Sequence, residues 1–146
     1  MRRLALLAAL LLAGLFFAVM RPPASSFGES ISLEAFQKMA EPEISSVETG
    51  SYPAIVYIHA DWCADCTDME ARLKEPDAAR SLKRFRKYQL DATSASVWPA
   101  LTHIGIESVP ALIVLEEYQG HVRRRPLAAY SRMPAAALLS FLDFVP

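Results

Sequence analysis

The hydrophobic pattern divides the chain into an apolar leader and a region in which strands and helices alternate. Residues 4–20 carry no charged side chain. Residues 54–59 and 111–115 are short apolar runs, as expected of buried strands. Further strands are predicted over residues 86–90 and, after a turn at 118–120, over residues 121–127. Helical spacing predicts a first helix that is capped by Ser30 or Ser32 and ends near Met39, and a second helix that ends near Lys74. Three more helices are predicted over residues 77–85, over residues 99–103 and from Pro134 onward.

This order of elements places parallel βαβ units first and an antiparallel hairpin last. It predicts an α/β fold with a central mixed β-sheet flanked by helices on both faces. We expect residues 1–21 to be a signal peptide or membrane anchor, residues 22–30 a linker, and residues 31–146 one domain. About 120 residues are enough for a single hydrophobic core.

The leader has the features of an export signal, because Arg2 and Arg3 precede the apolar run. The positive-inside rule keeps these arginines in the cytoplasm and sends the rest of the chain across the membrane. The 17 residues of the run just reach the length of a spanning helix. Cleavage therefore stays open. The expected location is periplasmic or otherwise extracytoplasmic, either secreted or anchored to the inner membrane by residues 4–20.

Charge argues against a nucleic-acid partner. Three of the 15 basic residues (Arg2, Arg3 and Arg21) belong to the leader region, while all 16 acidic residues follow it. The remainder is therefore acidic, whereas nucleic-acid binders carry basic surfaces.

The chain has only two cysteines, Cys63 and Cys66, placed between a predicted strand and a predicted helix. This spacing lets the sulfurs bond, and the positive end of the helix dipole stabilises a thiolate on the first of them. We expect Cys63 to attack and Cys66 to resolve the mixed disulfide. No cofactor is expected beyond this redox-active pair. A metal is not expected either, because the three histidines lack the paired spacing of zinc ligands. A purely structural disulfide is the alternative.

The segment from Tyr57 to Cys66 resembles the active-site segment of the thioredoxin-like superfamily. Its Ala-Asp-Trp-Cys-x-x-Cys form is similar to the periplasmic C-terminal domain of the thiol–disulfide interchange protein DsbD. The resemblance continues through Met69-Glu70, residues 87–91, residues 105–110 and residues 141–143, and it spans about residues 31–145.

The resemblance implies roles for several further residues. Pro110 would be a cis-proline facing the cysteine pair, and the backbone of Val109 would pair with an extended substrate segment. Trp62 would shield the sulfurs and form part of the docking surface. Lys87 matches a lysine that partners a buried aspartate in thioredoxins.

One position departs from the family pattern. The buried aspartate that helps to take a proton from the second cysteine is replaced by Tyr57, whose phenol has an ordinary pKa of about 10 and is a poor base at neutral pH. Asp61 and Asp65 are the nearest alternative acids. The charge of Asp65 would raise the pKa of the Cys63 thiol, whereas the helix dipole lowers it.

The sequence thus predicts an exported thiol–disulfide oxidoreductase that acts on the thiols and disulfides of other exported proteins. The DsbD likeness and Asp65 favour a reductase supplied by a membrane electron donor of the DsbD type. A disulfide oxidase is one alternative. A non-enzymatic, membrane-tethered adaptor or chaperone is another, and the Tyr57 replacement motivates it.

Overall fold

The computed structural model describes residues 27–41, 52–129 and 133–144. The expected leader lies outside these residues. Within the described ranges, no helix is long and apolar enough to cross a membrane. In chain order, the elements are β1 (Glu29–Ser30), α2 (Leu33–Ala40), β2 (Ala54–His59), α3 (Ala64–Leu73), α4 (Pro76–Ser81), the 3-10 turn η1 (Leu82–Arg84), β3 (Arg86–Asp91), the 3-10 turn η2 (Ala95–Val97), α5 (Trp98–His103), β4 (Ala111–Tyr118), β5 (His121–Ala128) and α6 (Ala135–Asp143).

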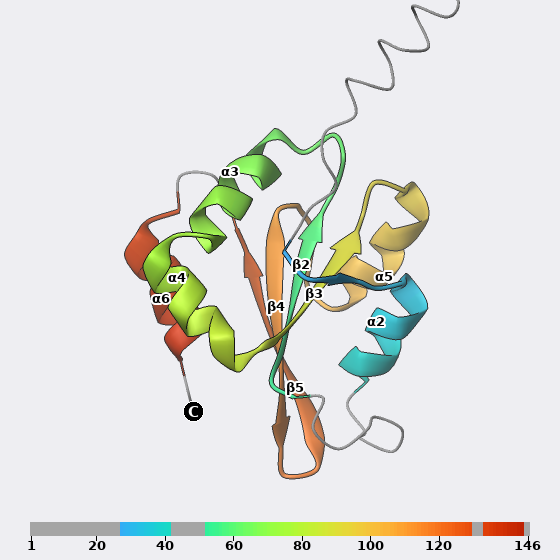
Figure 1. Ribbon diagram of the computed structural model, residues 1–146. Helices are drawn as coiled ribbons and strands as arrows, with labels where there is room; N and C mark the ends of the chain where they lie inside the picture. Colours follow the sequence, from blue (N-terminus) through green and yellow to red (C-terminus); the bar gives the residue numbers. More distant parts are fainter. Residues whose placement is uncertain (1–26, 42–51, 130–132, 145–146) are drawn as a thin grey trace, which may run out of the picture.

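The strands form one mixed sheet in the order β1-β3-β2-β4-β5. β1, β3 and β2 are parallel, β4 runs antiparallel to β2, and β5 runs antiparallel to β4. Helices α3, α4 and α6 cover one face of the sheet, while α2 and α5 cover the other (Figure 1). The predicted α/β fold with a mixed, doubly covered sheet is therefore confirmed.

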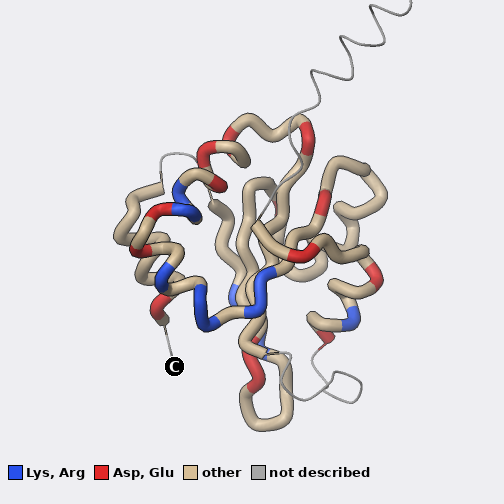
Figure 2. Tube along the Cα trace, viewed as in Figure 1, with Lys and Arg blue, Asp and Glu red and all other residues tan. Residues whose placement is uncertain are grey.

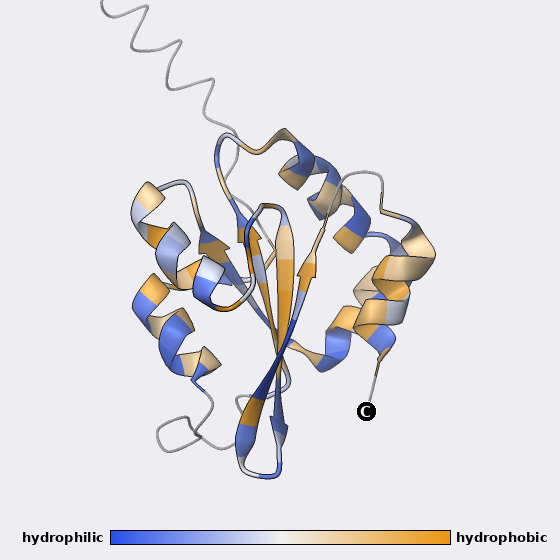
Figure 3. Cartoon of the chain, turned by 180° about the vertical axis from the view of Figure 1, so that it is seen from behind, coloured by the Kyte–Doolittle hydropathy of each residue, from blue (hydrophilic) through white to orange (hydrophobic). Residues whose placement is uncertain are grey.

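Two buried clusters form the core, one on each face of the sheet. Val56 and Ile58 of β2 belong to the cluster under α2 and α5, and Ile55 and Tyr57 belong to the cluster under α3, α4 and α6. Figure 3 shows hydrophobic colour in the middle strands and hydrophilic colour toward the β4–β5 hairpin. Because both faces of β2 are covered, its apolar run has no polar alternation.

Strand β1 corrects the expected boundary between linker and domain. Residues 22–30 are predicted to be a linker, but Glu29 and Ser30 pair in parallel with β3. Gly28 makes this approach possible, because a Cβ there would lie 2.3 Å from the Lys87 carbonyl oxygen. A two-residue strand is too short to leave a periodic pattern in the sequence.

The helices follow their predicted signals with one exception. Ser32 caps α2, since its hydroxyl accepts a hydrogen bond from the Ala35 N–H (3.1 Å). The single helix expected over residues 77–85 is instead α4, which begins at Pro76, followed by the 3-10 turn η1. Proline suits the first position of a helix, because its missing N–H is not needed there.

Two arginines fix the last turn of α6 against the rest of the domain. Arg84 donates a hydrogen bond to the Leu142 carbonyl, and Arg125 donates one to the Phe141 carbonyl. These carbonyls lie in the last turn of a helix, where intrahelical partners run out. Arg125 also pairs with Glu116 of β4 (3.4 Å), which links α6 to the sheet.

Candidate redox site

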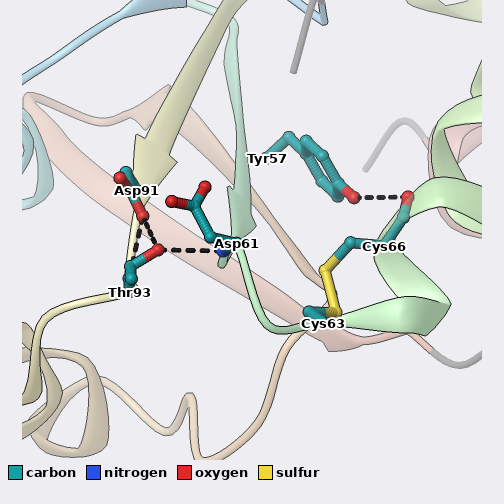
Figure 4. The surroundings of a disulfide bond; sticks show 6 residues. All are labelled: Tyr57, Asp61, Cys63, Cys66, Asp91 and Thr93. Carbon is teal, nitrogen blue, oxygen red and sulfur yellow. Dashed lines mark hydrogen bonds between the residues drawn. A yellow bond between two sulfur atoms is a disulfide. The ribbon is translucent and has the colours of Figure 1, made fainter. Parts of the chain in front are cut away.

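The cysteine pair lies at the edge of the sheet where β2 and β3 end and β4 begins. The Cys63 N–H donates to the Ala60 carbonyl (3.1 Å), which closes the turn between β2 and α3. Cys63 is the N-cap residue of α3, and Cys66 lies in its first turn. Their sulfurs form a disulfide, with an S–S distance of 2.08 Å and a Cα–Cα distance of 5.4 Å (Figure 4).

The two sulfurs have unequal access to solvent. Cys63 is half-buried, whereas Cys66 is 5% exposed and belongs to the cluster under α3. No side chain caps α3. The unpaired N–H groups and the dipole of its first turn are therefore available to stabilise a thiolate on Cys63. This arrangement can support disulfide exchange in which Cys63 meets the partner and Cys66 stays shielded.

Tyr57 lies beneath the cysteine pair with its side chain fully buried. Its hydroxyl donates a hydrogen bond to the Cys66 carbonyl oxygen (2.9 Å; Figure 4). Burial, and secondarily the negative charge of Glu70, raise the pKa of Tyr57 well above its usual range. The hydroxyl is therefore protonated at neutral pH and cannot accept a proton from Cys66.

Glu70 lies near the site, although it was predicted only as part of the Met69-Glu70 resemblance and without a role in the site. It lies one helical turn after Cys66, half-buried, and its carboxylate is 3.9 Å from the Lys74 amine. The spacing of four residues from Cys66 is the signal that could have found it, because such positions share one face of a helix. Glu70 lines a pocket together with Phe27 and Lys87.

The structure does not gather the other predicted tuning residues into one cluster. Asp61 is exposed in the turn before the cysteines, and Asp65 is exposed in the first turn of α3. Lys87 is exposed on β3, in register with Ile55 rather than with Tyr57. Within the described ranges, no salt bridge joins Lys87 to a carboxylate.

A polar network ties the turn before the cysteines to the end of β3. The Asp61 N–H donates to the Thr93 hydroxyl oxygen (2.9 Å). The Thr93 N–H and hydroxyl both donate to one Asp91 carboxylate oxygen (2.8 and 2.5 Å; Figure 4). This network holds the loop that carries Trp62 and Cys63, and neither Thr93 nor Asp91 was predicted to take part in the site.

The expected docking residues lie beside the same loop. The Val109–Pro110 peptide bond is cis, as the resemblance implies, and so is the Tyr52–Pro53 bond, which was not predicted. Ala111 pairs with Ile58, so Pro110 adjoins the chain that leads from β2 to the cysteines.

Trp62 is 61% exposed, and its ring stacks on that of Trp98 with 6.3 Å between centroids. Trp98 is half-buried at the start of α5. Trp98 is not among the predicted site residues, because it lies far from the cysteines in the sequence and no local spacing relates it to them.

The acidic and histidine side chains do not form a metal centre in the part of the chain that the structure describes. No group of three or more Cys, His, Asp or Glu residues is placed there to hold a metal ion.

Comparisons with known proteins bear on the fold. No protein-family model and no curated protein matches the chain. Among solved structures, it is similar to a thioredoxin from Thermus thermophilus, with 19% identity, a TM-score of 0.57, and coverage of 79% of this chain and 84% of that one. It is also similar to the oxidised C-terminal domain of DsbD from Neisseria meningitidis, with 20% identity, a TM-score of 0.55, and coverage of 80% and 97%.

At these identities the likeness concerns the fold. Both similar structures cover most of this chain, and most of each of their own chains is covered. The expected fold is therefore confirmed: this chain has the thioredoxin-like fold, with a Cys-x-x-Cys pair at the start of α3.

Proposed function

We propose that this protein is an extracytoplasmic thiol–disulfide reductase that exchanges disulfides with exported proteins. The observation that carries the proposal is the Cys63–Cys66 disulfide at the N-terminus of α3, with one sulfur half-buried and the other shielded. The similarity to thioredoxin and to the DsbD C-terminal domain supports it at the level of fold.

In the proposed reaction, the Cys63 thiolate attacks a sulfur of the partner's disulfide, and the partner's first thiolate leaves. The Cys66 thiol then gives its proton to solvent and attacks the Cys63 sulfur, which releases the partner's second thiolate. The partner's two thiolates take up protons from solvent. The partner gains two electrons, and the Cys63–Cys66 pair is oxidised. Tyr57 keeps its proton throughout, so its part is to hold the Cys66 carbonyl.

The partner surface of the proposed enzyme comprises Trp62 and the Val109–Pro110 step. Val109 and Cys63 pack against the same buried cluster. An extended segment of the partner would pair with the Val109 backbone and bring its disulfide to Cys63. Recycling needs a dithiol donor, which we propose to be a membrane protein of the DsbD type.

Residues 4–20 support the extracytoplasmic location, because an apolar run after two arginines is typical of exported proteins. In this proposal the segment is either cleaved or kept as an inner-membrane anchor.

Insulin reduction tests the activity. The wild-type protein should reduce insulin with dithiothreitol as donor, Cys63→Ser and Cys66→Ser should not, and Thr67→Ala, at an exposed position of the same helix, should match the wild type. Full activity in both cysteine variants would overturn the proposal.

The reduction potential of the Cys63–Cys66 pair tests the direction of electron flow. A value near about −270 mV supports a reductase, and one near about −120 mV supports an oxidase.

The alternative is a membrane-tethered adaptor whose cysteine pair takes no part in disulfide exchange. The presence of Tyr57 in place of the buried aspartate of the family favours this alternative. An adaptor would hold its partners equally well after Cys63→Ser, and this substitution therefore separates the two functions.

A further inference from the structure

A stacked tryptophan pair, with Trp62 exposed and Trp98 half-buried, lies beside the cysteine that meets the partner. Trp62 directly precedes Cys63, is 61% exposed, and stacks on Trp98 with an interplanar angle of 29°. A stacked pair covers only one face of each ring. The outer face of Trp62 therefore stays open to whatever approaches Cys63.

The surroundings of this tryptophan pair are negatively charged. The sequence has no Lys or Arg between Lys38 and Arg72, or between Lys87 and Arg123, and these two segments supply the β2–α3, β3–α5 and α5–β4 connections at this edge of the sheet. Four of the exposed carboxylates lie there, on Asp61, Asp65, Asp91 and Glu107. Figure 2 shows acidic segments on these loops.

No basic side chain neutralises these carboxylates within the described residues. The ion pairs there involve Glu70, Asp77 and Glu116 instead. The hydrogen bonds of the Asp91 carboxylate come from Thr93, which is neutral. A cation that approaches Trp62 would therefore meet an open indole face and uncompensated negative charge at the same place.

We propose that Trp62 and Trp98 form a specificity surface that selects disulfides whose flanking residue is Lys or Arg. This inference rests on the proposed function and names its substrate class: extended polypeptide segments with a positive charge beside the reacting cysteine. The open indole face of Trp62, which Trp98 supports from behind, attracts the cation by cation–π interaction, and the surrounding carboxylates add attraction that salt weakens. The exchange itself is the one described above, with the partner's disulfide reduced and the Cys63–Cys66 pair oxidised.

Three cyclic disulfide peptides that differ only in the residue beside one cysteine test the inference. The pre-reduced protein should react fastest with the Arg peptide, more slowly with the Leu peptide, and slowest with the Glu peptide. We expect the Arg peptide to exceed the Leu peptide about two- to fivefold at low salt, the size of an exposed cation–π contact. Equal rates for the Arg and Leu peptides, or a faster Leu peptide, would overturn it.

Substitutions of Trp98 test whether the tryptophan pair causes the preference for the Arg peptide. Trp98→Leu should bring the Arg-to-Leu rate ratio close to one, and Trp98→Phe should keep most of it. Tyr118→Leu, which changes an exposed aromatic ring in the β4–β5 hairpin, should leave the ratio at the wild-type value. A wild-type ratio in Trp98→Leu would contradict the inference.

Charge variants remain informative if Trp98→Leu does not fold. Asp61→Asn, at an exposed position, should lower the Arg-to-Glu ratio, while Glu34→Gln on α2 should not. An unchanged ratio in Asp61→Asn would count against the charge part of the proposal.

A small neutral disulfide, 2-hydroxyethyl disulfide, separates this inference from the proposed function. If the protein reduces it and shows no peptide preference, the inference fails and the proposed function stands. If the protein reduces none of the disulfides, the proposed function fails, and the inference fails with it.

Discussion

The two faces of β2 differ in chemistry, although alternate residues of one strand build them. Toward α2 and α5, Val56 and Ile58 join a cluster of apolar side chains. Toward α3, Tyr57 brings a buried hydroxyl that holds the Cys66 carbonyl, and the ring of His59 stacks on it with 5.6 Å between centroids. One face of the strand therefore serves stability alone, and the other also supports the cysteine pair.

Ile58→Ala should produce the larger loss of stability. Its side chain is fully buried, so the substitution removes apolar contacts and leaves a cavity, at a cost of about 2–5 kcal/mol. Urea unfolding measures the loss. Because Ile58 faces away from the cysteine pair, the reduction potential should stay at the wild-type value. A reduction potential that moves by about 30 mV, equivalent to about 1.4 kcal/mol, would contradict the claim that only the face of β2 toward α3 supports the cysteine pair.

Tyr57→Phe should cost less, because it keeps the ring and removes only the hydroxyl. We expect a loss of about 0.5–1.5 kcal/mol, the usual contribution of one hydrogen bond. The pH profile of disulfide exchange between about pH 6 and pH 9 should keep its shape, since a group with a raised pKa does not titrate there. A profile that loses an inflection in Tyr57→Phe would show that the hydroxyl takes part in proton transfer.

The wild-type protein and Tyr57→Phe should also differ in how their stability changes at high pH. The pKa of Tyr57 is raised on folding, so its contribution is fully present below the unfolded value of about 10. Above that pH the unfolded chain releases the proton while the folded protein retains it. Wild-type stability should therefore fall more steeply than that of Tyr57→Phe, by up to about 1.4 kcal/mol per pH unit. Urea unfolding at alkaline pH measures both slopes, and identical slopes would contradict the raised pKa.

Glu70→Gln should have the smallest effect. It removes the charge that is the lesser cause of the raised pKa of Tyr57, so this pKa should fall but stay above its ordinary value. The loss of the ion pair with Lys74 should cost at most about 1 kcal/mol. Ultraviolet titration of the tyrosines, with Glu34→Gln as the control, measures the change. A pKa of Tyr57 that returns to its ordinary value in Glu70→Gln would mean that charge, rather than burial, is the main cause of the raised pKa.

The same contrast explains how far the sequence could predict the structure. Continuous apolar runs identify β2 and β4 because a doubly covered strand needs them on both faces, and Cys63 and Cys66 identify the site by local spacing. Contacts between distant segments leave no such signal. The Trp62–Trp98 stack and the Asp61–Thr93–Asp91 network exist because β2 and β3 end at the same edge of the sheet. β1 was not predicted, because a strand of two residues is too short to show an alternation of hydrophobic and polar positions.

Capture of partners by Cys66→Ala tests the central claim most directly, namely that Cys63 attacks and Cys66 resolves. The variant, incubated with an oxidised substrate peptide and acid-quenched, should accumulate one mixed disulfide, which mass spectrometry should locate at Cys63. Cys63→Ala should accumulate far less, because Cys66 is buried. A mixed disulfide that forms at Cys66 as readily as at Cys63, or at neither, would contradict the account.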